Sequence, residues 1–338
     1  MSPPNPDRFK VSHDGLGYLL AIGGAVLFSF KAVLAKLAFI PLDADAAAMG
    51  EVAIDPLTLM VLRLGFSMPV YLIIWWMVTR KNRARGHHVA AKTMAKVAGL
   101  GVLCYYVCTL LDFSGLQYIT AQLERLILFT YPVFVVIFGA LFFGGRITKW
   151  GAAAVIIAYS GIALIFAVGN IAVGSNVPLG SALVMSSAVL FALYQLLSKG
   201  LIDQVGAKLF TCIAMTAAAT VTGLHFITLH GGIDGARIAL DLPPRLYVIG
   251  AAIALFSTIL PSFMIATAVG RVGPQAVAIL AMIGPAATIA GAVFILSEPF
   301  GWVDALGTAI TMIGIGLYTL IDKRAKIKAR SVDPAFIR

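Results

Sequence analysis

Residues 17–36, GYLLAIGGAVLFSFKAVLAK, recur in a related form as residues 180–199, GSALVMSSAVLFALYQLLSK. Both copies reach the roughly 20 apolar residues that a helix needs to cross the hydrocarbon core of a bilayer. At this offset of 163 residues, identical residue types recur for Gly17, Leu20, Ala25, Val26, Leu27, Phe28, Leu34 and Lys36. The stretch therefore predicts a membrane-spanning helix that the chain uses twice.

A second internal match lies further along the chain. An offset of 153 residues places AQLERLILFTYPVF (121–134) on PQAVAILAMIGPAA (274–287), so that Pro132 falls on Pro285 and Gln122 on Gln275. Internal similarity at a fixed offset indicates a repeated structural unit. The two matches together predict a tandem of two units, in which the paired prolines are candidate hinges.

The composition places the chain in a membrane. Of its 338 residues, 60% are hydrophobic and 12% are charged, and the mean hydropathy is +0.95. Soluble domains carry about twice that share of charge. The three cysteines lie in apolar runs without metal-ligand spacing, so neither a metal nor a cofactor is expected.

Ten apolar segments are long enough to span the bilayer, and we expect an all-α integral membrane protein of ten helices. Because each unit then holds five helices, an odd number, the second unit enters the membrane in the opposite sense, as inverted repeats do. The expected spans are 15–39, 56–79, 94–112, 118–144, 149–169, 178–200, 207–229, 246–270, 274–297 and 301–321.

The distribution of basic residues predicts the orientation. The segments RKNRARGHHVAAKTMAK (80–96) and DKRAKIKAR (322–330) are strongly basic, and basic loops stay in the cytoplasm. We expect both termini to be cytoplasmic in a bacterial-type plasma membrane. The predicted order is a tail (1–14), a first repeat (15–169), a second repeat (178–321) and a basic tail (322–338).

The order of features in both halves resembles the EamA-type transporters of the drug/metabolite transporter superfamily. The resemblance rests on the repeated small-residue helix, the matched prolines and the segment SEPF (297–300), followed by Gly307 and Gly314. It implies ten helices around a central cavity and transport of small metabolites. The family usually has a Glu after the fourth helix of each half, whereas this chain has Glu298 in the second half and Gly145-Arg146 in the first.

Charged residues inside the spans are the first candidates for function, because a charge at mid-bilayer costs at least about 2.5–3.5 kcal/mol unless it faces a cavity or a partner. Lys31 lies about 16 residues into the first span, and Glu124 and Arg125 are adjacent in the fourth. Adjacent residues point about 100° apart on a helix, so at least one of the two needs a partner on another helix.

Several pairings remain open at this stage. Glu124 pairs with Lys31 or Arg63 and neutralises it, or else Lys31 faces an anionic group of a substrate and Glu124 exchanges protons. Arg63 lies close enough to the outer surface to snorkel, and Lys36 and Lys199 are expected to anchor their helices at the interfaces.

Aromatic and amide side chains complete the predicted substrate site. Tyr194, the repeat mate of Lys31, is followed by Gln195, so the two halves offer different polar groups. Tyr105 shares a predicted helical stripe with Thr109 and Asp112, and Asp112 is close enough to the outer end to be solvated. The predicted substrate-binding residues are Lys31, Tyr105, Glu124, Arg125, Tyr194 and Gln195.

These residues favour a secondary transporter that exports a small polar or anionic metabolite, such as an amino acid or organic acid, with coupling to protons. The expected partners are this solute, protons and the bilayer, with no nucleic acid. Efflux of cationic drugs and flipping of a lipid or lipid-linked sugar are the alternatives. The chain has no GxxxxGK[ST] motif, so ATP-driven transport is not expected. It has no paired carboxylates, no HExxH motif and no nucleophile with a base at useful spacing, so an enzyme is not expected.

Overall fold

The computed structural model describes residues 15–41, 53–84, 89–142, 149–169, 173–272, 277, 280, 281 and 283–332. Every element in these ranges is a helix. The prediction of an all-α membrane protein is therefore confirmed. The predicted tail 1–14 and the pair Gly145-Arg146 lie outside the described residues, as does Gln275.

The helices follow the apolar segments closely, because the length of each apolar run fixes where a span begins and ends. Among the described residues, the third and eighth spans are each divided into three elements that follow one another without a loop, and the fourth span is divided into two elements by a turn. The elements are α1 (Gly15–Phe39), α3 (Pro56–Ala84), α4 (Ala91–Gly101), η2 (Val102–Cys108), α5 (Thr109–Leu116), α6 (Ala121–Leu128), α7 (Tyr131–Phe142), α8 (Lys149–Val168), α9 (Val177–Val205), α10 (Ala207–Leu229), α11 (Ile233–Ala239), α12 (Pro244–Ala254), η3 (Leu255–Ile259), α13 (Leu260–Val272), α15 (Ile283–Leu296) and α16 (Trp302–Val332).

Eight helical stretches among the described residues are long and apolar enough to cross a membrane. Two shorter apolar helices, Ile283–Leu296 and Trp302–Leu317, occupy the positions of the expected ninth and tenth spans. The expected ninth span begins at 274, where part of the chain lies outside the described residues. The ten-helix inverted repeat remains a prediction.

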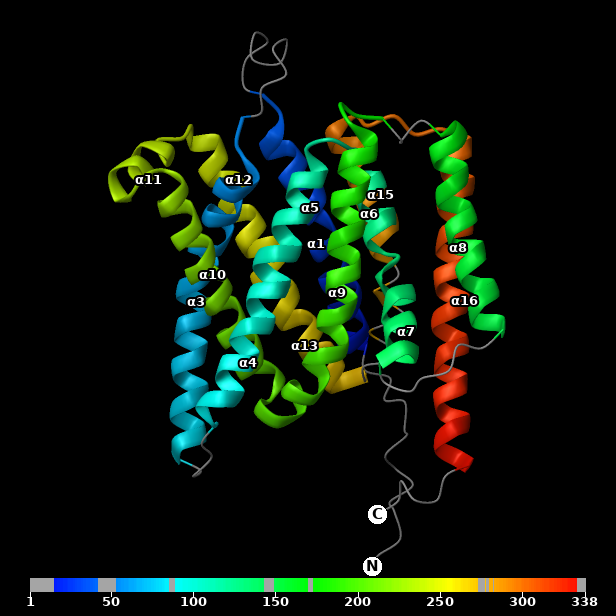
Figure 1. The fold of residues 1–338 in the computed structure, drawn as a ribbon, viewed down its shortest axis with the longest axis horizontal. Coiled ribbons are helices and arrows are strands. Elements are labelled where there is room, and N and C mark those ends of the chain that lie inside the picture. Colours follow the sequence, from blue (N-terminus) through cyan, green and yellow to red (C-terminus); the bar gives the residue numbers. More distant parts are fainter. Residues whose placement is uncertain are drawn as a thin grey trace, which may run out of the picture.

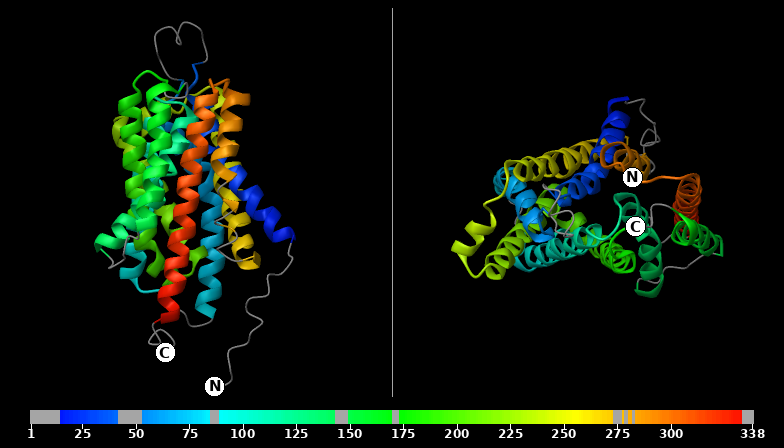
Figure 2. Two further views of the ribbon diagram at one scale, coloured as in Figure 1. Left: turned by 90° about the vertical axis from the view of Figure 1, so that its right-hand side faces the viewer. Right: turned by 90° about the horizontal axis from the view of Figure 1, so that it is seen from above.

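The helices run roughly side by side between two ends (Figure 1). We call the end that holds Gly15, Ala84 and Ala91 the lower end, and the end that holds Phe39 and Pro56 the upper end (Figures 1 and 2). The short helix α11, which the sequence analysis did not predict, lies beside the upper end of α10 (Figure 1).

Two of the spans contain a π-helical segment, η2 in the third span and η3 in the eighth. The segments begin at Val102 and Leu255, and 255 minus 102 is 153, the same offset that aligns Pro132 with Pro285. Short π-helical segments inside α-helices are rare and often mark functional sites. Their matched positions are a structural counterpart of the sequence repeat.

The fourth span is interrupted between α6 and α7. The hydroxyl of Thr130 donates to the Ile127 carbonyl at 2.6 Å, and the backbone N–H of Thr130 donates to the same carbonyl at 3.0 Å, so the turn after α6 is closed on this oxygen. Pro132, which has no N–H to donate, is the second residue of α7, a position where the missing donor costs little. Helix α15 likewise begins two residues before Pro285. Whether these breaks act as hinges is still a prediction.

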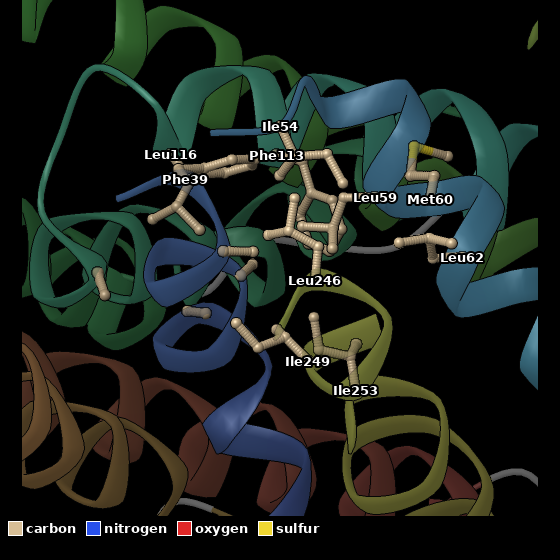
Figure 3. Close-up of a cluster of buried hydrophobic side chains, with 14 of the residues drawn as sticks. Phe39, Ile54, Leu59, Met60, Leu62, Phe113, Leu116, Leu246, Ile249 and Ile253 are labelled. Carbon is tan, nitrogen blue, oxygen red and sulfur yellow. The ribbon is translucent and has the colours of Figure 1, made fainter. Parts of the chain in front are cut away.

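A buried apolar cluster joins α1, α3, α5 and α12 near the upper end (Figure 3). Phe39 meets Phe113 edge to face, with ring centroids 6.4 Å apart. Leu59, Met60 and Leu246 are fully buried in the same cluster. This packing fixes the upper parts of α1 and α5, the helices that position the charged residues described next.

Helices α8 and α16 pair closely at one side of the bundle (Figures 1 and 2). A Cβ atom on Gly161 would lie 2.4 Å from the carbonyl oxygen of Gly307, which is shorter than any real contact. Small residues at such positions let two membrane helices approach closely. The fifth helix of one predicted repeat therefore packs against the fifth helix of the other.

Candidate functional site

Three helices bring four charged side chains together in the upper half of the bundle. Lys31 extends from α1, Asp112 from α5, and Glu124 and Arg125 from α6. We call these four residues the charge cluster. All four are buried, with Glu124 fully so.

Lys31 forms a salt bridge with Asp112, in which the ammonium nitrogen lies 2.5 Å from the carboxylate Oδ2. The ammonium also lies 5.6 Å from the centre of the Phe113 ring, where the ring face stabilises a cation. The salt-bridge partner of Lys31 is thus Asp112 and not Glu124. The expectation that Asp112 is solvated is wrong, since its side chain is 2% exposed.

The carboxyl group of Glu124 lies close to that of Asp112, and the two interact electrostatically. A hydrogen bond between two carboxyl groups requires a proton on one of them. Neither Glu124 oxygen receives a hydrogen bond in the described part of the chain. Its nearest cation is the Arg125 Nε at 4.0 Å, beyond hydrogen-bonding distance. A proton between the two carboxyl groups would neutralise one of two like charges that are buried side by side.

Arg125 forms its contacts with other helices. The adjacent positions of Glu124 and Arg125 predicted such a partner for at least one of these two residues. The Arg125 Nη2 donates to the Ser29 carbonyl at 3.0 Å, and the Thr288 hydroxyl donates to the same carbonyl at 2.9 Å. The guanidinium also lies about 6 Å from the rings of Phe28 and Phe129, at 6.0 and 5.9 Å. This one carbonyl therefore joins α1 to α6 and to α15.

The predicted aromatic residues form a second group, next to the charge cluster. The rings of Tyr105 and Tyr194 meet edge to face, with their centroids 6.2 Å apart. Both residues pack with Phe210 of α10. Gln195 is exposed on α9, so the described structure does not place it with the other predicted residues.

Arg63 connects the two groups. It interacts electrostatically with both Tyr105 and Asp112, and its Nε donates to the Thr258 hydroxyl at 3.0 Å. Arg63 is 5% exposed, so the prediction that it snorkels to the outer surface is wrong. A buried arginine needs fixed acceptors, and the hydroxyl on η3 supplies one.

The sequence did not indicate the roles of Asp112 and Arg63, because both positions lie near the outer end of a span, where solvation or snorkelling is the expected state. A regular α-helix was also assumed in the third span. The π-helical segment η2 ends just before Thr109, whose hydroxyl donates to the Cys104 carbonyl five residues earlier at 3.5 Å. The stripe of Tyr105, Thr109 and Asp112 therefore does not keep the α-helical period. The balance of charges in the spans could have indicated these roles, because each buried cation needs an acidic partner.

Lys36 and Glu298 stabilise the connection between α5 and α6, residues 116–122, which we call the upper elbow. The Lys36 ammonium donates to the carbonyls of Leu116 at 2.8 Å and Ile119 at 2.7 Å. The Glu298 carboxylate accepts from the backbone N–H groups of Ala121 at 2.8 Å and Gln122 at 3.3 Å.

Each contact satisfies backbone groups that a helix end leaves unpaired, and the acid lies where the helix dipole favours a negative charge. Lys36 is accordingly bonded to the chain's own carbonyls, which corrects the prediction of an interfacial anchor. Glu298, which follows the fourth helix of the second repeat, thus bonds to backbone N–H groups of the first repeat.

Comparison with known proteins gives a family. The model described as the EamA-like transporter family matches residues 15–167 and again residues 178–320. The uncharacterized transporter YcbK of Bacillus subtilis (strain 168) is 26% identical over 302 residues, which are 89% of this chain and 92% of that protein. An uncharacterized transporter of Archaeoglobus fulgidus is 26% identical over 249 residues, covering 71% and 82% of the two chains.

A solved structure, titled only as the crystal structure of a protein, superposes with a TM-score of 0.54 at 18% identity over 90% of this chain and 98% of its own. That likeness concerns the fold alone. The family match spans nearly the whole chain, and the named relatives are transporters. The chain therefore belongs to the EamA-like transporter family, within the drug/metabolite transporter superfamily.

Proposed function

We propose that the protein exports a small polar metabolite with an anionic group, amino acids being the leading class, in exchange for protons across a bacterial-type plasma membrane. The single observation that carries this proposal is the charge cluster. It places two cations and two carboxyl groups in one buried group, and both signs are needed to bind a zwitterion.

When a zwitterionic solute binds, its two charged groups replace the contacts that the residues of the charge cluster lose to one another. The carboxylate of the solute binds Lys31 or Arg125 in place of Asp112. The ammonium group of the solute binds Asp112 and Glu124 in place of Lys31 and the shared proton. Breaking a buried ion pair is costly when a charge is left alone. A solute that replaces both partners avoids that cost, whereas water or a neutral solute does not.

Proton coupling follows from the carboxyl pair. The ammonium group of the solute and the shared proton compete for the same two carboxyl groups of Asp112 and Glu124. Ligands that exclude each other at one site travel in opposite directions in an alternating-access cycle. With a proton gradient directed into the cell, such an exchange drives export.

The two-fold organisation supports alternating access. The π-helical segments lie at the offset of the sequence repeat, and the fourth span is broken near one of the matched prolines. Inverted repeats with broken helices near the substrate site are typical of secondary transporters. We propose that the chain has this architecture, with both termini in the cytoplasm and residues 15–169 and 178–321 as its two repeats.

Proton coupling can be tested with purified protein in liposomes, by loading labelled amino acids under an imposed pH gradient. We expect Glu124→Gln to retain exchange of labelled for unlabelled solute and to lose accumulation driven by the gradient, because an amide cannot share a proton with Asp112. Asp203→Asn, at an exposed carboxylate on α9, is the matched control. Normal gradient-driven accumulation by Glu124→Gln would rule out this coupling.

The anionic end of the solute is tested by Lys31→Ala, with Lys199→Ala as the control at an exposed lysine. We expect Lys31→Ala to weaken transport of every acidic and zwitterionic solute and Lys199→Ala to leave it unchanged. If Lys31→Ala has no effect on any of them, the proposed substrate contact is wrong.

One observation favours a second candidate, efflux of cationic drugs. In the described structure the Glu124 carboxylate accepts no N–H hydrogen bond, and a cationic solute would supply that missing partner. The same variants separate the two functions. A cationic substrate requires Glu124 and does not require Lys31, whereas a zwitterionic substrate requires both.

A further inference from the structure

A cavity of about 880 Å³ lies between α3, α4 and α10, near the lower end and apart from the charge cluster. Much of its wall is apolar, formed by Leu72 and Trp75 of α3, Met94 of α4 and Leu209 of α10. Leu72 is 41% exposed, so the cavity is open to the lipid side of α3. We call it the lower groove.

The rim of the lower groove is polar and basic. Thr79, Arg80 and Asn82 belong to its lining and lie about 10–15 Å along α3 from Leu72, at roughly 1.5 Å per residue. The Arg80 guanidinium lies over the Trp76 ring, 4.7 Å from its centre. Stacking of this kind holds a guanidinium in place while leaving its N–H groups available to an anion.

The helix segments around the groove carry a single sign of charge. The ranges 72–84, 89–97 and 207–213 contain no Asp or Glu, and their basic residues are Arg80, Lys81, Arg83, Lys92, Lys96 and Lys208. Basic pockets between helices on the cytoplasmic side of a membrane bind anionic headgroups. The lower end is also the end that the basic loops assign to the cytoplasm.

We propose that the lower groove binds one anionic glycerophospholipid of the inner leaflet. The phosphate meets Arg80 at the rim, where the planar guanidinium donates two parallel hydrogen bonds to oxyanions. The acyl chains lie along the apolar wall of Leu72, Trp75 and Leu209. A free phosphate ion would use the rim alone and would leave this apolar wall exposed to water.

The site also adjoins the predicted substrate residues. Leu209 and Met94 of the groove pack in the same buried cluster as Tyr194, with Tyr105 against it. A bound lipid therefore stabilises the face of α10 on which the Tyr105–Tyr194 pair rests. This role is independent of which solute the protein transports.

Native mass spectrometry of the full chain in detergent tests the proposal. The probes are phosphatidylglycerol, phosphatidylcholine and inorganic phosphate, each titrated separately. We expect phosphatidylglycerol to bind more tightly than phosphatidylcholine, and Arg80→Gln to weaken it by about tenfold, as for one lost charged hydrogen bond. Lys199→Gln removes an exposed cation of α9 outside the lining and should have no effect.

A second variant tests the apolar wall without altering any charge. Leu72→Trp adds an indole ring at a partly exposed position of the groove and should weaken phosphatidylglycerol binding while Arg80 is intact. Equal binding of the two lipids, unchanged binding in Arg80→Gln, or unchanged binding in Leu72→Trp would each overturn the proposal. Displacement of the lipid by inorganic phosphate at equal concentration would assign the rim to a free anion instead. Gel filtration and melting temperature verify that each variant is folded.

Discussion

The Lys31–Asp112 salt bridge makes a prediction that can be worked through in magnitude. Both side chains are buried, at 9% and 2% exposure, and the two charged atoms lie 2.5 Å apart. Removing one partner of a buried pair costs about 3–5 kcal/mol, because the other charge is left without compensation. Lys31→Met and Asp112→Asn should each destabilise the protein by about 3 kcal/mol, the lower end of this range.

The lower end applies because Glu124 lies beside Asp112. In Asp112→Asn, Glu124 supplies the carboxylate that Lys31 needs, and in Lys31→Met the two carboxyl groups share a proton. The double variant Lys31→Met/Asp112→Asn buries neither charge alone, so its cost should fall below the sum of the single costs by about 2 kcal/mol or more. In a Glu124→Gln background, each single cost should rise toward about 5 kcal/mol.

The assay is reversible unfolding in mixed detergent micelles, which gives the free energy of unfolding for each member of the cycle. Lys199→Met and Asp203→Asn form the control cycle, since they remove an exposed lysine and aspartate four residues apart on α9. Such pairs contribute about 0.3–0.5 kcal/mol. Single costs at positions 31 and 112 that simply add in the double variant, within about 0.5 kcal/mol, would refute the pairing.

Three further predictions concern the structural contacts around the site. Glu298→Gln should lower the free energy of unfolding by about 1–2 kcal/mol, because a neutral amide accepts weaker hydrogen bonds from the start of α6, and a melting curve measures the loss. Gly161→Val should destabilise the α8–α16 pair, since its Cβ would lie 2.4 Å from the Gly307 carbonyl, whereas Gly223→Ala has open space and should be neutral or stabilising by the same melting assay. Tyr194→Phe should keep the packing and weaken solute binding, seen as a raised KM in the liposome assay with little change in melting temperature; a large fall in melting temperature would instead assign the hydroxyl to structure.

The sequence predicts most of the fold because the membrane leaves few choices. An apolar run of about 20 residues must become a helix that satisfies its own backbone. The predicted spans 15–39 and 207–229 coincide with α1 and α10, and the span 149–169 differs from α8 by one residue. The sequence could not predict where a helix is locally irregular, as in η2 and at the break after α6.

The site was predicted only in part for a related reason. Lys31, Glu124 and Arg125 stand out because charges are expensive in a membrane, and the structure places all three together. The choice of Asp112 as the partner of Lys31 depends on a contact between positions 81 residues apart. Helical periodicity carries no information on such a contact, and the position of Asp112 near the outer end favoured solvation instead.

In the proposed alternating-access cycle, Glu298 would stabilise closure of one end of the protein more than closure of the other. Its carboxylate bonds the upper elbow, and the aligned position of the first half carries Gly145-Arg146, which has no acid to do the same. A bias of about 2 kcal/mol corresponds to roughly a thirtyfold preference between two states. In the proposed cycle, the favoured conformation of the empty transporter is therefore the one in which the upper end is closed and the pathway is open to the cytoplasm. An exporter binds its substrate from the cytoplasm in this conformation.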